Sequence, residues 1–167
     1  VSDAGSSFKD IFSEIITLGK VDPLLLEKHI TYLHWNEARE FRMLIIRPYS
    51  RYDNDIFLHQ LRRTILKIFP FSSTNIIEQS MVIILKSQDL PICPPDMLAD
   101  TLMLHGKAFI GVSLPFQDLT KLHYYYDQTS YALERGAENG AAQAKTVFYA
   151  FDTMIPYIIC SANPGGI

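Results

Sequence analysis

Histidines are the residues of this sequence best suited to proton transfer or metal binding, and their spacing favours neither role. The five are His29, His34, His59, His105 and His123. None of them forms an HExxH or HxH pattern. His29 and His34 are also spaced so that they do not share one face of a helix. We therefore expect ordinary surface or half-buried histidines and no metal-binding residue.

Serine, cysteine and glycine patterns also lack the partners that chemistry requires. Ser113 follows Gly111, but Pro115 stands where a GxSxG nucleophile elbow needs its second glycine. Cys93 and Cys160 match no metal or redox spacing, so we expect reduced thiols. The other glycines that could cradle a phosphate lack a loop motif around them: Gly136, Gly140 and the Gly165–Gly166 pair. The sequence therefore predicts no catalytic residue and no cofactor-binding residue.

A run of tyrosines, Tyr124 to Tyr126 with Tyr131, could form an aromatic partner surface, since tyrosine is favoured at interfaces. Consecutive residues point around a helix, so the three cannot share one core. We expect Tyr125 and Tyr126 to pack on a sheet and Tyr124 to be exposed.

The basic cluster of Arg62, Arg63 and Lys67 is interpreted as the solvated face of a helix, in a position that suits the helix dipole. A nucleic-acid patch is the less favoured reading.

Composition limits the class of protein further. The chain has 167 residues, 48% of them hydrophobic and 20% charged, which is ordinary for a soluble globular domain. A formal net charge of -3 gives no overall attraction to nucleic acid or anionic lipid. No apolar run approaches the about 20 residues that span a bilayer, and no signal peptide is visible. We expect a cytoplasmic protein without a membrane partner.

The stretch from residue 108 to residue 137 positions the other elements. An apolar run with β-branched residues ends at Pro115 and predicts a strand. Asp118 is a good N-cap residue, and the helix that it begins has an apolar stripe. The stripe comprises Leu119, Leu122, Tyr126, Thr129 and Leu133.

The remaining pattern alternates helices and strands around a tight hairpin. Further helices are predicted at residues 8–18, 24–34, 54–69, 95–105 and from 152 onward. Further strands are predicted at residues 41–46, 74–78, 80–85 and 146–150, with loops at 86–94 and 138–145. The inward residues of the 54–69 helix are predicted to be Phe57, Leu61, Ile65 and Ile68. This order predicts an α+β fold with a mixed, mainly antiparallel sheet flanked by helices, and an N-terminal helical pair.

Three segments, IGVSLPFQDL, YYDQTSYALERG and VFYAFD, carry a family pattern. Its positions are Gly111, Ser113, Pro115, Tyr126, Gln128, Ala132, Leu133 and Val147 to Asp152. In order and spacing, the pattern resembles the GGDEF-like domain of PucR/CdaR-type bacterial transcription regulators. The resemblance implies a nucleotide cyclase-like fold and says little about chemistry.

Catalytic GGDEF domains, as the resemblance implies, hold a divalent cation with a carboxylate at the end of the first strand and another in the Gly-Gly-Asp-Glu-Phe hairpin. Here the first strand ends in Arg47. Ile77 and Glu78 replace the two glycines, and Gln79 and Ser80 replace the two acids. Glu78 is the remaining carboxylate, and Arg47 is expected to pair with it or to face solvent. We therefore expect no diguanylate cyclase activity.

The resemblance implies a non-catalytic regulatory and dimerisation domain that also senses an effector. Residues 1–38 form the N-terminal helical segment, 39–153 the degenerate GGDEF-like domain, and 154–167 the start of a linker. We expect a homodimer that contacts DNA only through a C-terminal helix-turn-helix module, which this chain does not contain. A small-molecule or nucleotide receptor without turnover is the first alternative. A residual cyclase and a purely structural dimerisation module are the others.

Overall fold

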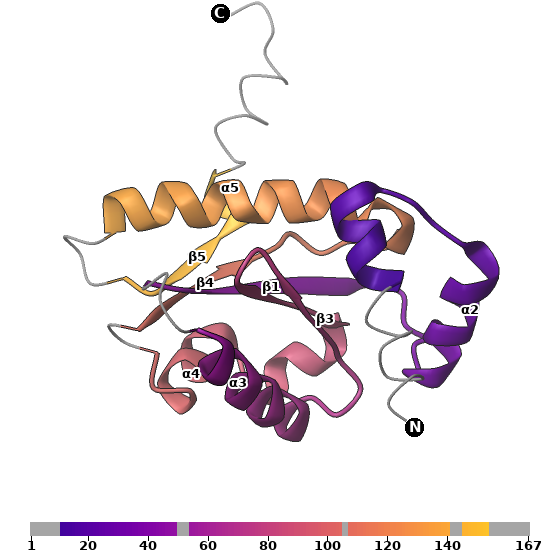
Figure 1. Cartoon of the computed structure of the whole chain (residues 1–167), viewed down its shortest axis with the longest axis horizontal. Helices are drawn as coiled ribbons and strands as arrows, with labels where there is room; N and C mark the ends of the chain where they lie inside the picture. Colours follow the sequence, from indigo (N-terminus) through magenta and orange to yellow (C-terminus); the bar gives the residue numbers. More distant parts are fainter. Residues whose placement is uncertain (1–10, 50–53, 105–106, 141–144, 154–167) are drawn as a thin grey trace, which may run out of the picture.

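The protein is an α+β domain built on one five-stranded sheet (Figure 1). A computed structural model describes residues 11–49, 54–104, 107–140 and 145–153. The strands are β1 (Phe41–Pro48), β2 (Ser73–Ile77), β3 (Ser80–Lys86), β4 (Ala108–Val112) and β5 (Val147–Tyr149). They lie in the order β2-β3-β1-β4-β5, and only the β4–β5 pair is parallel. The predicted mixed, mainly antiparallel sheet is confirmed.

The first four strands and the helices between them form a split βαβ arrangement, in which β1 pairs antiparallel with both β3 and β4. Helix α5 (Leu122–Gly140) then crosses over the sheet and adds β5 parallel to β4. A parallel pair needs such a long crossover, whereas β2 and β3 need only a hairpin. In the resulting strand order, β1 lies at the centre of the sheet.

β1 is buried on both faces, as its continuous apolar sequence predicts. Alternate residues enter two different cores: Met43 and Ile45 face one, Leu44 and Ile46 the other. All four side chains are inaccessible to solvent. A charged residue fits this strand only near its ends, which is where Arg42 and Arg47 lie.

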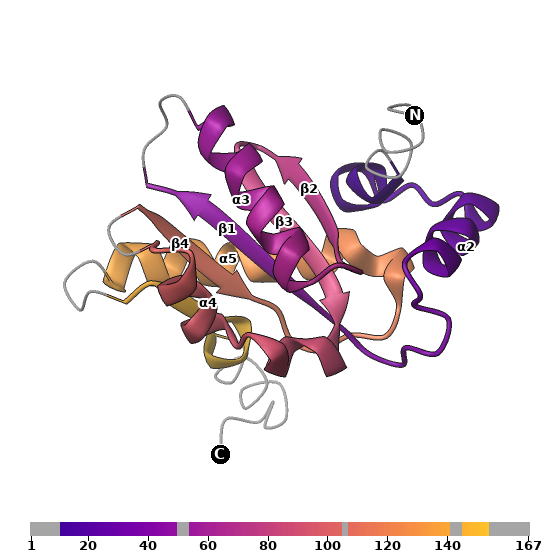
Figure 2. The same cartoon turned by 90° about the horizontal axis from the view of Figure 1, so that it is seen from below.

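Helices α3 (Asp55–Ile68) and α4 (Pro95–Thr101) cover one face of the sheet, and α5 covers the other (Figures 1 and 2). The fully buried residues of α3 are Leu58, Leu61 and Ile65. Phe57 and Ile68, predicted inward, are only partly buried. Leu58 takes the inward position because it lies one turn before Leu61 on the same helical face.

Two predicted segments differ in the structure around α4. The predicted loop at residues 86–94 contains a 3-10 helix, η1 (Ser87–Ile92). The helix predicted to run to residue 105 ends at Thr101, because Met103 adopts a positive φ of 53°. The amide of Leu104 then donates to the carbonyl of Ala99, the closing bond of a Schellman motif. Residue 105, the predicted end of this helix, lies outside the described residues.

The cap of the long helix is confirmed: the Asp118 carboxylate accepts from the amide of Thr120 at 2.9 Å. The first turn is a 3-10 segment, η2 (Leu119–Lys121), and α5 follows it. At its other end α5 reaches Gly140, so the loop predicted from residue 138 begins later. Gly136 lies inside the helix, where its lack of a side chain leaves the space in which Phe148 of β5 packs.

The N-terminal segment contains a helix at residues 11–18, which ends at Gly19, and α2 (Pro23–Tyr32). Asp22 caps α2, and Pro23 begins it, where a missing backbone N–H costs nothing. The helix predicted to reach residue 34 ends at Tyr32, because His34 adopts a φ of 59° in a Schellman motif.

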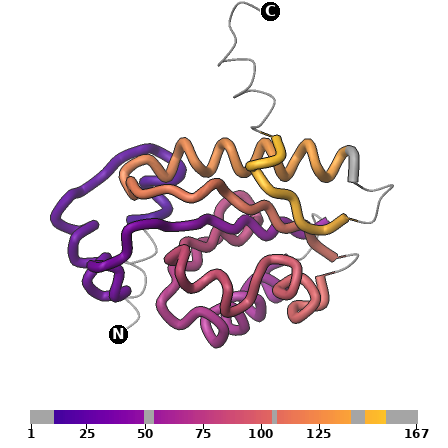
Figure 3. Tube along the Cα trace, turned by 180° about the vertical axis from the view of Figure 1, so that it is seen from behind, coloured from indigo at the N-terminus to yellow at the C-terminus, as the bar shows by residue number. Residues whose placement is uncertain are grey.

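These N-terminal helices share the core on the α5 side of the sheet (Figures 1 and 3). Phe12 lies 5.7 Å from the ring of Trp35, and Trp35 lies 5.1 Å from Phe41 of β1. The indole of Trp35 also donates to the carbonyl of Phe71 at 2.8 Å. The pair therefore packs on the sheet.

No helix within the described ranges is both long enough and apolar enough to cross a membrane.

Candidate functional site

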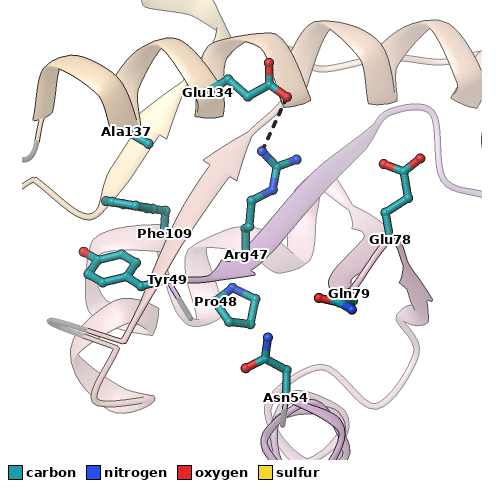
Figure 4. A pocket seen from close by; sticks show the side chains of 9 residues that line it. All are labelled: Arg47, Pro48, Tyr49, Asn54, Glu78, Gln79, Phe109, Glu134 and Ala137. Atoms are coloured by element: carbon teal, nitrogen blue, oxygen red, sulfur yellow. Dashed lines mark ion pairs between the residues drawn. The ribbon is translucent and has the colours of Figure 1, made fainter. Parts of the chain in front are cut away.

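A groove of about 590 Å³ opens where β1 ends, between the β2–β3 hairpin tip and the C-terminal half of α5 (Figure 4). Its size falls within the range of small-molecule sites. Its described lining comprises Arg47, Pro48, Tyr49, Asn54, Glu78, Gln79, Phe109, Glu134 and Ala137. The groove thus lies at the edge of the sheet where the resemblance places the cyclase chemistry.

The hairpin tip is a two-residue turn, because Ile77 pairs with Ser80. Its residues, Glu78 and Gln79, have φ values of 50° and 63°. Positive φ at both positions is the requirement of a type I′ turn, which normally uses Asn-Gly. A side chain in this conformation costs roughly 1–2 kcal/mol for each residue. The turn therefore keeps two polar side chains at the groove where glycine would relieve strain.

Arg47 lies at the base of the groove, between β3 and α5. Its Nε donates to Ser80 Oγ at 3.4 Å, and its Nη1 lies 3.7 Å from Glu134 Oε1 on α5. The Arg47 side chain is 30% exposed and so still faces solvent in part, but the carboxylate beside it is Glu134 instead of Glu78, because the crossover brings α5 over this end of β1. Glu134 remains 63% exposed, so this ion pair contributes no more than about 1 kcal/mol.

Tyr126 joins α5 to the hairpin. Its hydroxyl donates to Glu78 Oε2 at 3.5 Å, a long and weak bond. Burial raises the pKa of the Tyr126 phenol, and the negative charge of Glu78 raises it further. The phenol therefore stays neutral, and its hydroxyl can act as the hydrogen-bond donor to Glu78.

An aromatic pair forms one end of the groove. The rings of Tyr49 and Phe109 lie 4.0 Å apart between centroids, and Phe109 also packs against Phe148. Tyr49 is 42% exposed, so an apolar surface remains open beside the guanidinium. Figure 4 shows these rings on one side of Arg47 and Glu78 on the other.

The serine and glycine that resembled a nucleophile elbow have structural roles. Ser113 Oγ accepts from the amide of Met43 and donates to the carbonyl of Leu114, both at 2.8 Å. Gly111 lets α5 approach, since a Cβ there would lie 3.2–3.3 Å from Leu133 and Thr129. These contacts bury both residues between β1, β4 and α5.

The tyrosine prediction is confirmed. Tyr126 is buried, Tyr125 stacks on Phe116 with centroids 4.3 Å apart, and Tyr124 is 57% exposed. Tyr131 is exposed on α5, with the Arg135 guanidinium 5.8 Å from its ring centre. A role of this surface in partner binding stays a prediction.

The histidine and arginine predictions need one correction each. His29 is fully buried, because Nδ1 contacts the carbonyl of Leu25 at 2.7 Å and the ring packs edge-on against Phe12. Arg62 is half-buried and burial lowers the pKa of its guanidinium, whereas Arg63 and Lys67 are exposed as predicted.

Within the described ranges, no group of three or more His, Cys, Asp or Glu side chains could hold a metal ion. Cys93 is a buried free thiol, whereas Cys160 and His105 lie outside those ranges.

Sequence reasoning singled out Arg47 and Glu78 but did not identify the groove as a binding site. Glu134 and Phe109 carried no local signal, because only the fold brings them beside the hairpin. The sequence shows that the hairpin contains no glycine. The strain depends on the hairpin register, because the pairing of Ile77 with Ser80 makes Glu78 and Gln79 the two turn residues.

The chain matches no model of a known protein family, and no curated protein matches it.

Proposed function

We propose that this chain is the non-catalytic regulatory and dimerisation domain of a PucR/CdaR-like transcription regulator in the cytoplasm. The α+β sheet order and the residues of the resemblance support this assignment. In the full-length protein, a helix-turn-helix module follows the domain and contacts DNA as part of a homodimer. A shift between dimer arrangements would transmit the signal.

The position of Arg47 is the observation that carries the proposal. The guanidinium lies at the end of β1, with Ser80 and Glu134 holding it there. A divalent cation needs several oxygen ligands and is repelled by a fixed positive charge. The groove therefore favours recognition over metal-assisted phosphoryl transfer.

The first test is turnover. We expect no dinucleotide when the chain is incubated with GTP and Mg²⁺ and the products are separated by mass spectrometry. An active diguanylate cyclase serves as the positive control. Any dinucleotide whose formation requires this chain would contradict the proposal.

The second test is oligomeric state. We expect light scattering at high protein concentration to give twice the mass of one chain. A monomer under these conditions would count against a dimerisation domain. The full reading frame provides an independent check, because the proposal requires a helix-turn-helix downstream.

A receptor without turnover is the second candidate, and the strained turn at the groove favours it. Strain at a site is often maintained by the function that it serves. A panel of nucleotides and metabolites in a thermal shift assay tests this role, because binding to the native state raises apparent stability.

A further inference from the structure

The described lining of the groove has one positive and two negative side chains, and it matches neither a simple anion nor a simple cation. Arg47 would attract an anion, but Glu78 and Glu134 would oppose it. The two carboxylates would attract a cation, but Arg47 would lie beneath it. A ligand that carries both charges satisfies both sets, since complementary charge patterns determine specificity.

We propose that the groove binds a zwitterionic small molecule of the α-amino acid type with an apolar side chain. Arg47 holds the carboxylate, because a guanidinium matches carboxylate geometry. Glu78 holds the ammonium group. The inference names the signal of the regulatory domain and so rests on the proposed function.

Glu78 is better placed than Glu134 to take the ammonium. Glu134 already pairs with Arg47, whereas Glu78 accepts a 3.5 Å bond from Tyr126. The turn also keeps Glu78 in a left-handed conformation despite the strain. A carboxylate placed at this cost, with capacity for further hydrogen bonds, is suited to binding a cationic group.

The aromatic end of the groove accounts for the apolar side chain. Tyr49 and Phe109 present their rings on the side of Arg47 opposite to Glu78 (Figure 4). A ligand whose carboxylate lies on Arg47 can therefore place its ammonium toward the hairpin and its side chain toward the rings. Burial of an apolar group against these rings adds affinity.

Three probes with related phenyl-alkyl skeletons separate the charges: L-phenylalanine, 2-phenylethylamine, which lacks the carboxylate, and 3-phenylpropanoate, which lacks the ammonium. We expect calorimetry to show L-phenylalanine binding about tenfold or more tighter than either analogue, the effect of losing one charge-assisted contact. L-alanine should bind more weakly than L-phenylalanine. Equal binding of L-phenylalanine and either analogue would overturn the inference.

Charge-neutralising variants assign each contact. Arg47→Gln should weaken L-phenylalanine binding about tenfold while leaving 2-phenylethylamine unweakened. Glu78→Gln should also weaken L-phenylalanine binding, but here the analogue whose binding is not weakened should be 3-phenylpropanoate. Glu27→Gln, on the exposed face of α2, is the matched control and should change nothing. If Arg47→Gln and Glu78→Gln have no effect on L-phenylalanine, the groove is not the site.

Arg47→Lys guards against a folding artefact, because it keeps the charge and should retain part of the affinity lost in Arg47→Gln. The two proposals also fail separately. If none of the probes binds at millimolar concentration while the chain is a dimer without turnover, the amino acid inference is wrong and the proposed function stands.

Discussion

At the residue scale, the β2–β3 turn concentrates backbone strain beside the groove. Glu78 and Gln79 are two of four non-glycine residues with positive φ in the described chain; the other two, His34 and Met103, are at helix ends. A helix end tolerates one such residue because the Schellman bonds satisfy its carbonyls. A hairpin with two in succession is the more costly arrangement.

Gln79→Gly should therefore stabilise the protein. Glycine adopts the left-handed conformation without steric cost, but it also loses more freedom on folding, so the net gain is about 0.5–1 kcal/mol. The expected rise in Tm is about 1–4 °C in calorimetry. Gln60→Gly on the exposed face of α3 is the control and should lower stability by about 1 kcal/mol. A drop in stability for Gln79→Gly would show that the turn is not strained.

We predict that ionisation of Tyr126 lowers the stability of the protein at alkaline pH. Its pKa is raised in the folded state by burial, with Glu78 adding to the effect, so the unfolded chain loses the phenol proton first. Stability should consequently fall as pH rises above about 10, the ordinary tyrosine pKa. Tyr126→Phe should show a smaller decline in urea midpoint between about pH 10 and 11. Tyr131→Phe, at an exposed position, should keep the decline of the unmodified chain.

At the scale of elements, α5 joins the parts of the site. Tyr126 and Glu134 lie two turns apart on the helix and contact the hairpin and β1, respectively. The close packing of α5 on the sheet depends on two glycines, Gly111 in β4 and Gly136 in α5 itself. The helix can hold Glu134 beside Arg47 only while these close approaches persist.

Gly136→Ala tests the closest approach. In an open helix, this change would stabilise by about 1 kcal/mol through helix propensity. Here the new Cβ would lie 2.1 Å from the Phe148 ring, which must move. We expect a net destabilisation of about 1–3 kcal/mol by urea denaturation, the range for overpacked cores. Equal or greater stability would contradict the packing of α5 on β5.

At the scale of the whole molecule, two cores lie on opposite faces of one sheet, and β1 contributes to both. The N-terminal helices belong to the core on the α5 side, where Phe12 and Trp35 are almost fully buried. His123 Nδ1 at the start of α5 also contacts the carbonyl of Ile16 at 2.7 Å. The helical pair should therefore unfold together with the sheet.

Phe12→Ala should destabilise the whole domain by about 3–5 kcal/mol, the range for removing a buried aromatic side chain. Trp35, the single tryptophan, reports on this core. Fluorescence and far-UV circular dichroism should give coincident transitions in both the unmodified chain and the variant. Leu18→Ala is the control on the same helix, since Leu18 is 62% exposed and should change stability by less than about 0.5 kcal/mol. Separate transitions would mean that the helical pair is an independent unit.

Most elements could be predicted from local patterns because their signals are short-range. The Asp118 and Asp22 caps, the apolar run of β1 and the tight hairpin all depend on neighbouring residues. The helix ends at His34 and Met103 were missed, because neither residue is the glycine that usually marks a left-handed helix cap. The burial of His29 was missed because Phe12, seventeen positions away, makes the contact.

The sequence by itself determined the α+β class, the two-face burial of β1 and the presence of a cation where the resemblance expects an acid. These follow from periodicity and residue type along the chain. Only the tertiary structure decided that Arg47 pairs with Glu134, that Tyr49 and Phe109 form a wall beside it, and that Gly136 is a packing site. The physical reason is that these contacts join segments brought together by sheet order and by the α5 crossover, and no local propensity encodes them.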